Sequence, residues 1–210
     1  MQSAVIDSSS SIADFLTAAA AKQSTPGGGS VTALAGALAA SMGEMVLHYS
    51  VGKKDLHAHE AKLQMILKEF ERARGLLLQL MVEDQGAFQL LTSARKAADG
   101  KGDSDPAFAA ALLACIRIPQ SVGATAIAIL DLAEQAAPIC NKWLLSDLAV
   151  CAELATAATR CAAYNVRINL NDVSDADEKA RLAKDTDLMI QHAVQRVQRL
   201  LPAIWNRASH

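Results

Sequence analysis

The chain has 210 residues and a formal net charge of −2, with 51% hydrophobic and 20% charged residues. This length and apolar content fit one globular domain with a sizeable core. The near-neutral charge, without a basic cluster, argues against nucleic-acid binding. Glu44 and His48 interrupt the run that comes closest to a membrane span, so no membrane association is expected. No basic region followed by an apolar block opens the sequence, so no signal peptide is expected either.

Residue preferences and helix breakers predict an all-helical chain. Aromatic residues make up only 4% of the sequence and alanine and leucine are abundant, which favours helix over sheet. Ser11 can cap the first helix, and Pro119 is expected to divide two later ones. In chain order, helices are predicted from the Ser11 cap to 22 and over 29–49, 56–98, 106–117, 119–136, 144–169 and 175–201. The prediction is an all-α, single-domain helical bundle with long antiparallel helices over residues 1–210.

Three consecutive glycines stand directly before a long alanine-rich run. On a helical wheel this run has a stripe of large apolar residues and, opposite it, a stripe of small ones. The stripes are Val31, Leu34, Leu38, Met42 and Met45, and Ala33, Gly36, Ala40 and Gly43. Two apolar faces predict a helix that is buried on both sides at the centre of the bundle.

The start of that helix allows two interpretations. Unpaired N–H groups at a helix N-terminus can bind an anion or the polar edge of a ligand. The stretch is not a Walker loop, because no Gly-Lys-Ser/Thr follows, and it is not a dinucleotide fingerprint, because no strand precedes it. The glycines form either a structural turn and cap or part of a ligand site.

Five islands of sequence lie in order along nearly the whole chain. They are TPGGGSVTALAGALAASMGEMV followed by SVGKK (25–46 and 50–54), EDQGAF (83–88), IPQSVGATA (118–126), LLSDLAV (144–150) and AAYNVRINL (162–170). Together they resemble the cyclodeaminase/cyclohydrolase family, and the Thr-Pro-Gly-Gly-Gly-Ser block is the most specific of them. That family includes the cyclodeaminase domain of formiminotransferase-cyclodeaminase and stand-alone methenyltetrahydrofolate cyclohydrolases. The resemblance implies a dimerising helical bundle that acts on the one-carbon unit of tetrahydrofolate.

Two reactions are implied by this resemblance. Hydrolysis of 5,10-methenyltetrahydrofolate adds water to the bridging carbon and breaks one C–N bond, which leaves 10-formyltetrahydrofolate. Cyclodeamination joins the formimino carbon to the second nitrogen and expels ammonia. Both reactions require a base, a proton donor for the leaving nitrogen and a negative field near the cation. Neither requires a metal or a redox cofactor, so none is expected.

Asp84 and Asp147 are the catalytic candidates. Asp84 lies inside an apolar helix, where burial would raise its pKa toward the range of an acid–base catalyst. The alternative is an ordinary aspartate on the helix surface. Asp147 opens a helix, where it would serve equally well as a cap or as a partner of the helix dipole. Either carboxylate could instead hold the amidine edge of the pterin ring.

Further residues are candidates for substrate binding. They are Pro26, Gly27, Gly28, Gly29, Ser30, Lys53, Lys54, Asn141, Asn165 and Asn169. The paired lysines suit the carboxylates of the folate glutamate tail, although exposed lysines often serve only solubility. Asn165 and Asn169, one turn apart, would orient ligand or water, or simply pack.

Spacing along one predicted helix separates two of these candidates. Asp147 and Asn165 are 18 residues apart, which is about 27 Å on a continuous helix. They therefore cannot both contact one pterin ring from a single subunit. Either they touch different parts of the ligand, or a dimer brings one of them across.

The leading hypothesis is a cytoplasmic, homodimeric methenyltetrahydrofolate cyclohydrolase whose small-molecule partner is a reduced folate. The four cysteines form no CxxC pair and are expected to be reduced core thiols. Formiminotetrahydrofolate cyclodeaminase activity is the first alternative. A non-catalytic folate-binding or scaffold dimer is the second, because KKDLHAHE, TSARKAADGKG and CNKWLLSD depart from the family pattern. No metal site is predicted.

Overall fold

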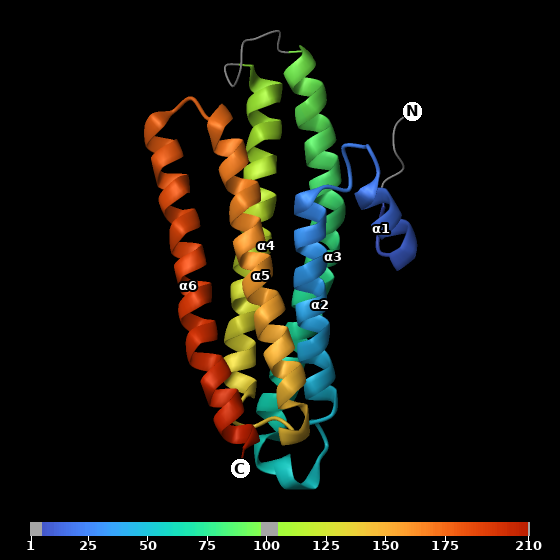
Figure 1. The fold of residues 1–210 in the computed structure, drawn as a ribbon, viewed down its shortest axis with the longest axis vertical. Coiled ribbons are helices and arrows are strands. Elements are labelled where there is room, and N and C mark those ends of the chain that lie inside the picture. Colours follow the sequence, from blue (N-terminus) through green and yellow to red (C-terminus); the bar gives the residue numbers. More distant parts are fainter. Residues whose placement is uncertain (1–5, 98–104, 210) are drawn as a thin grey trace.

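The long runs without helix breakers fold into helices that lie side by side (Figure 1). The computed structural model describes residues 6–97 and 105–209. Its α-helices are α1 (Ile12–Ala20), α2 (Gly28–His48), α3 (Glu60–Ala97), α4 (Pro106–Ala136), α5 (Leu145–Asn169) and α6 (Ala176–Ala208). Short 3₁₀ helices are η1 (Lys54–His59), η3 (Lys142–Leu144) and η4 (Leu170–Asp172). No strand occurs in these two ranges, and the prediction of an all-α helical bundle is confirmed.

Side-chain caps fix where several helices begin. Ser11 accepts a hydrogen bond from the backbone N–H of Asp14 (3.1 Å) and so caps α1, as the sequence predicts. Asp105 caps α4 and Asp175 caps α6, each by accepting from two backbone N–H groups of the first turn. Satisfying these otherwise unpaired donors sets the start of each helix to within a residue.

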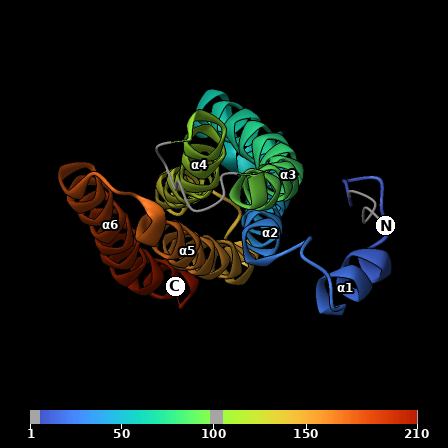
Figure 2. The same cartoon turned by 90° about the horizontal axis from the view of Figure 1, so that it is seen from above.

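The bundle is built around α2, α3, α4 and α5, with α6 packed on the outside of α4 and α5 (Figure 2). Fully buried side chains from these helices, such as Phe70, Leu77, Leu130 and Leu148, form the core. The short helix α1 lies to one side of the bundle and inserts Phe15 into the protein. The core of the protein therefore lies among these four central helices.

Pro119 does not divide a helix, which corrects the prediction of separate helices at 106–117 and 119–136. It lies inside the continuous helix α4. A proline has no N–H, so the carbonyl of Cys115, four residues earlier, has no helical donor. The side-chain amide of Asn169 on α5 donates to that carbonyl at 3.1 Å and replaces the missing bond. The helix continues because a neighbouring helix supplies the donor.

Only one of the two apolar stripes of α2 is buried. The small-residue stripe faces α3, where Gly36 meets Leu77 and Gly43 meets the ring of Phe70. The opposite stripe faces outward, with 44% of Val31 and 51% of Leu38 exposed. The expectation of burial on both sides is therefore wrong for the single chain. The small residues allow the close approach of α3. Of the large ones, Val31 and Leu38 are exposed, whereas Leu34 and Met42 pack partly against the core.

The apolar helices α2 and α4 and the four cysteines bear on two further predictions, the absence of membrane association and the reduced core thiols. Helices α2 and α4 are long and apolar enough to cross a membrane by length and composition alone, but both contribute to the packed core of the bundle. Packing accounts for their apolar character, and the absence of membrane association stays a prediction. All four cysteines are free, as expected, but Cys161 is exposed and is not a core thiol.

The contact between Gly43 and Phe70 predicts a stability difference between two glycine substitutions. A Cβ at Gly43 would overlap the Phe70 ring, so Gly43→Ala should lower the free energy of unfolding by about 1–3 kcal/mol. Gly75 lies in the middle of α3 with no atom within 4 Å of an added Cβ. Gly75→Ala should therefore raise the same free energy by about 0.4–1 kcal/mol. Urea unfolding of the two variants measures both, and a Gly43→Ala variant as stable as the wild type would contradict this packing.

Candidate active site

A cavity of about 570 Å³ opens between the first turn of α2 and the neighbouring parts of α3, α4 and α5. This volume lies within the range of small-molecule sites. Its walls combine polar, charged and aromatic side chains from segments far apart in the sequence. The residues that matter below are Gly28, Gly29, Asp84, Phe88, Thr92, Arg95, Cys115, Pro119, Asn165, Asn169 and Asp172.

Asp84 of α3 lies against the N-terminus of α2. Its carboxylate accepts a hydrogen bond from the Ser30 hydroxyl at 2.7 Å and a second one from the Ser30 backbone N–H. Burial raises the pKa of Asp84, and the two hydrogen bonds from Ser30 partly oppose that rise. A carboxyl group with a raised pKa at the wall of a cavity is suited to take up and release a proton.

The glycines before α2 are required by close approach. A Cβ at Gly29 would overlap the Asp84 carboxylate, and a Cβ at Gly28 would lie 3.1 Å from the Asn165 side-chain oxygen. Neither residue has a positive φ, so backbone conformation does not select glycine here. Because Gly28 and Gly29 have no side chains, the side chains of Asn165 and Asp84 can reach the start of the helix. The glycines thus lie both at the start of α2 and at the cavity wall, and their part in a ligand site stays a prediction.

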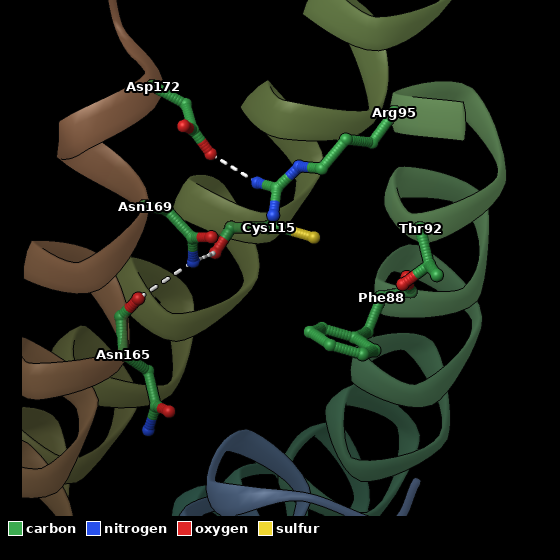
Figure 3. Close-up of polar contacts among 7 residues, drawn as sticks. All are labelled: Phe88, Thr92, Arg95, Cys115, Asn165, Asn169 and Asp172. Carbon is green, nitrogen blue, oxygen red and sulfur yellow. Dashed lines mark hydrogen bonds and ion pairs between the residues drawn. The ribbon is translucent and has the colours of Figure 1, made fainter. Parts of the chain in front are cut away.

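The two asparagines of α5 have their N–H groups engaged by the protein. The Asn165 amide nitrogen donates to the Thr32 hydroxyl (3.3 Å) and to the Cys161 carbonyl (3.0 Å). The Asn169 nitrogen donates to the carbonyls of Cys115 (3.1 Å) and Asn165 (2.8 Å), as Figure 3 shows for this pair of bonds. With the nitrogens fixed, each amide oxygen is the atom left to accept from a ligand.

Charged and aromatic side chains line the outer part of the cavity. Arg95 of α3 forms an ion pair with Asp172 of η4, which joins the two sides (Figure 3). Its guanidinium also lies 5.8 Å from the centre of the Phe108 ring. Phe88, one turn beyond Asp84 on α3, is 43% exposed. An exposed aromatic face in a polar cavity suits a flat heterocyclic ligand.

Cys115 is not a nucleophile in this site. Burial raises the pKa of its thiol to about 11, and the nearby charge of Asp84 adds to that rise. The thiol is therefore protonated at neutral pH, whereas attack requires the thiolate. The effect of Asp84 on Cys115 also indicates that the carboxylate sets a negative field inside the cavity.

The structure divides the predicted site residues into two groups. Around the cavity or its entrance turn it brings together Pro26, Gly27, Gly28, Gly29, Ser30, Asp84, Asn165 and Asn169. At the opposite end of the bundle, beside η1 and η3, it places Lys53, Lys54, Asn141 and Asp147 (Figure 1). Because α5 is continuous, Asp147 lies about 27 Å from Asn165, as the spacing predicts.

Residues of the second group have visible structural partners there. The Asn141 side chain accepts from the Trp143 N–H (3.2 Å) and donates to the Tyr49 carbonyl (3.2 Å), which joins two connecting segments. Asp147 lies in the first turn of α5, where a negative charge favours the helix dipole. One chain therefore offers these residues no contact with the cavity at Asp84.

Sequence reasoning missed Phe88, Thr92, Arg95, Cys115 and Asp172. A signal for part of this set was present, because Asp84, Phe88, Leu91 and Arg95 follow one another at helical spacings of four, three and four. That spacing places them on one face of α3. Nothing comparable marked Asp172, which reaches the cavity from η4. Among the described residues, no group of three His, Cys, Asp or Glu side chains is arranged to hold a metal ion.

The fold and the cavity define a class of protein: a helical bundle with a cavity of small-molecule size beside a half-buried carboxylate. A sequence model of the formiminotransferase-cyclodeaminase family matches residues 11–187. The chain belongs to that family, and the resemblance seen in its sequence islands is confirmed.

Some relatives are named as cyclohydrolases and others as cyclodeaminases. Methenyltetrahydrofolate cyclohydrolase of Methylorubrum extorquens is 32% identical over 177 residues, 81% of this chain and 85% of that protein. Formimidoyltransferase-cyclodeaminase of Sus scrofa is 27% identical over 85% of this chain, which spans only 34% of that longer protein. The crystal structure of formiminotetrahydrofolate cyclodeaminase from Thermotoga maritima superposes with a TM-score of 0.81 at 29% identity. It covers 93% of this chain and 97% of that one.

Burial of Asp84 predicts how stability depends on pH. Because its pKa is raised, the folded protein holds this proton more tightly than the unfolded chain does. The stability that Asp84 contributes is therefore present below its ordinary pKa of 3.8 and is lost as the pH rises through the raised value. Asp84→Asn cannot ionise, so at pH 7 its melting temperature should equal or exceed that of the wild type.

Calorimetric scans of both proteins at pH 7 and near pH 4 test this expectation. The advantage of the variant should shrink toward pH 4, where the wild-type carboxyl takes up its proton. A variant that melts well below the wild type at pH 7 would show that the carboxylate stabilises the fold.

Proposed function

We propose that this protein is a folate one-carbon enzyme that hydrolyses 5,10-methenyltetrahydrofolate to 10-formyltetrahydrofolate. The observation that carries the proposal is the half-buried Asp84 carboxylate at the wall of a cavity of ligand size. The stand-alone cyclohydrolase relative, aligned over most of both chains, supports this reaction over the alternatives. Neither a metal nor a redox cofactor is part of the proposal, because adding water to a carbocation needs neither.

Asp84 would act as the general base. Water attacks the carbon between the two nitrogens of the methenyl cation, and Asp84 takes one proton from it, which leaves a neutral hydroxyl adduct. The hydroxyl then loses its proton, the bond from the carbon to N5 breaks, and N5 takes up a proton. The formyl group remains on N10, and one proton is released overall. The Ser30 hydrogen bonds hold the carboxylate in place for both proton movements.

The charge distribution of the cavity suits a cationic substrate. Asp84 would supply negative charge beside the reacting carbon, and its charge also contributes to the raised pKa of the nearby Cys115 thiol. Arg95, the positive group of the lining, is paired with Asp172. A negative field that is already in place stabilises the cation without reorganisation.

Ring recognition would fall to the asparagines and to Phe88. The amide oxygens of Asn165 and Asn169 are available as acceptors, and a reduced pterin presents N–H and amino donors along its edge. The exposed ring of Phe88 offers a flat apolar surface for the aminobenzoyl ring, next to the one-carbon unit. These contacts would hold the one-carbon unit near Asp84.

Formiminotetrahydrofolate cyclodeaminase activity is the second candidate. The observation in its favour is the close superposition on a cyclodeaminase at 29% identity. The same carboxylate would take the proton from N10 as N10 attacks the formimino carbon. The former imine nitrogen takes up this proton and one more and leaves as ammonia, which gives the methenyl cation. Release of ammonia from 5-formiminotetrahydrofolate distinguishes this reaction. Failure of both assays would leave a folate-binding or scaffold dimer.

Loss of Asp84 should abolish turnover. With 5,10-methenyltetrahydrofolate as substrate, Asp84→Asn should lower kcat by about 10²- to 10⁴-fold, the usual contribution of a general base. The fall in near-ultraviolet absorbance of the substrate, corrected for the uncatalysed rate, measures it. Asp147→Asn is the matched control, because it makes the same change outside the cavity. A similar loss in both variants would instead support a site completed by a second subunit.

We also propose that the protein is a homodimer that works in the cytoplasm. The outward stripe of α2 supports association, because Val31, Leu38 and Tyr49 expose apolar surface along its length. On helix α5, which packs against α2, Tyr164 is also exposed. Free cysteines fit a reducing compartment.

A charge on that stripe should separate the subunits. Leu38→Glu is expected to convert a dimer into a monomer in sedimentation experiments, because a buried unpaired carboxylate is costly at an apolar interface. Leu188→Glu places the same charge on the exposed surface of α6 and should leave the dimer intact. A wild-type protein that sediments as a monomer at micromolar concentration would refute the proposal.

A further inference from the structure

The folate substrate proposed above carries a glutamate tail, whose carboxylates call for a positive partner. The sequence assigns this task to Lys53 and Lys54, but both lie at the opposite end of the bundle from the Asp84 cavity. Among the described residues that line the cavity, Arg95 is the sole lysine or arginine. Within one chain, Arg95 is therefore the positively charged residue of the cavity that suits the tail.

We propose that Arg95 binds the glutamate-tail carboxylate of the substrate and releases Asp172 to do so. This inference rests on the proposed function, because it takes a folate as the ligand. It assigns to Arg95 the choice between substrates with and without a tail, a task distinct from the chemistry at Asp84.

The position of Arg95 along α3 matches the shape of such a substrate. Asp84 and Arg95 are 11 residues apart on one continuous helix, about 16 Å along its axis. They lie on the same face, with Phe88 and Thr92 between them at the cavity wall. In a folate, the pterin and the glutamate are separated by a rigid aminobenzoyl group. A ligand with its one-carbon unit at Asp84 and its aminobenzoyl ring on Phe88 would thus extend its tail toward Arg95.

The present partner of Arg95 has the same chemistry as the tail. Asp172 offers a carboxylate to the guanidinium, and 58% of the Arg95 side chain and 37% of the Asp172 side chain are exposed. Ion pairs with this exposure contribute little to stability, so exchanging one carboxylate for another costs little. A guanidinium can also bind a carboxylate through two parallel hydrogen bonds, which adds to the gain from the exchange.

The contact with Phe108 would keep Arg95 in place during the exchange. The guanidinium lies 5.8 Å from the centre of that ring, a contact that does not involve Asp172. Release of Asp172 therefore leaves Arg95 oriented at the cavity. Asp172 acts as a stand-in for the tail when no substrate is bound.

Binding measurements with two ligands that differ only in the tail test this inference. Calorimetry compares the Kd for 5,10-methenyltetrahydrofolate with the Kd for 5,10-methenyltetrahydropteroate, which has no glutamate. In the wild type the glutamate should tighten binding. Arg95→Gln should reduce that preference by about two- to fivefold, the upper range for an exposed ion pair. Asp172→Asn should increase the preference, because the competing carboxylate is gone.

Lys96→Gln is the matched control, since it removes the same charge one residue further along α3 and outside the cavity lining. It should leave the preference at the wild-type value. An unchanged preference in Arg95→Gln overturns the assignment, as does a wild type that binds both ligands equally or neither of them.

Turnover of the tail-less ligand by the wild type, measured in parallel, tests the proposed reaction separately. Binding with a tail preference but without turnover would sustain the inference about Arg95 and refute the enzymatic function.

Discussion

The contact between Asp84 and the first turn of α2 is the constraint on which the rest of the site depends. A carboxylate on one helix can reach the N–H and hydroxyl of Ser30 on another only if nothing stands between them. Gly29 removes its own side chain at that point, and the small residues Gly36 and Gly43 keep α2 close to α3 further along. The alanine-rich composition of α2 is therefore a requirement of the site as well as of the core. Without this close approach, the carboxylate would reach solvent and lose its raised pKa.

Much of the fold is accessible from the sequence because it depends on local rules. Helix lengths follow from runs without breakers, and the Ser11 cap follows from the first polar residue before such a run. The glycine block lies at the wall of the cavity, where one of its two interpretations predicts a ligand site. These inferences need no knowledge of which helix packs on which.

Inferences that depend on the path of the chain in three dimensions are harder to make. Helical periodicity places a residue on a face but does not say which end of a bundle a connecting segment occupies. Lys53 and Lys54 suit a tail in charge, yet they follow α2 at the end away from Asp84. The local sequence predicts that Pro119 divides a helix. The donor that replaces its missing N–H, Asn169, lies fifty positions later and is not apparent from the sequence around the proline. Arg95 had a usable signal in its spacing from Asp84, but its partner Asp172 had none.

The hydrogen bond between Asn169 and the Cys115 carbonyl links the backbone of α4 to a side chain that lines the cavity. Because Pro119 leaves that carbonyl free, the Asn169 amide completes the hydrogen bonding of α4 and thereby has a fixed orientation. A residue with an N–H at position 119 would reclaim the carbonyl, and the amide would be free to turn its nitrogen toward the cavity. A substitution of Pro119 by a residue with an N–H would therefore also change the polarity that the Asn169 side chain presents to the cavity.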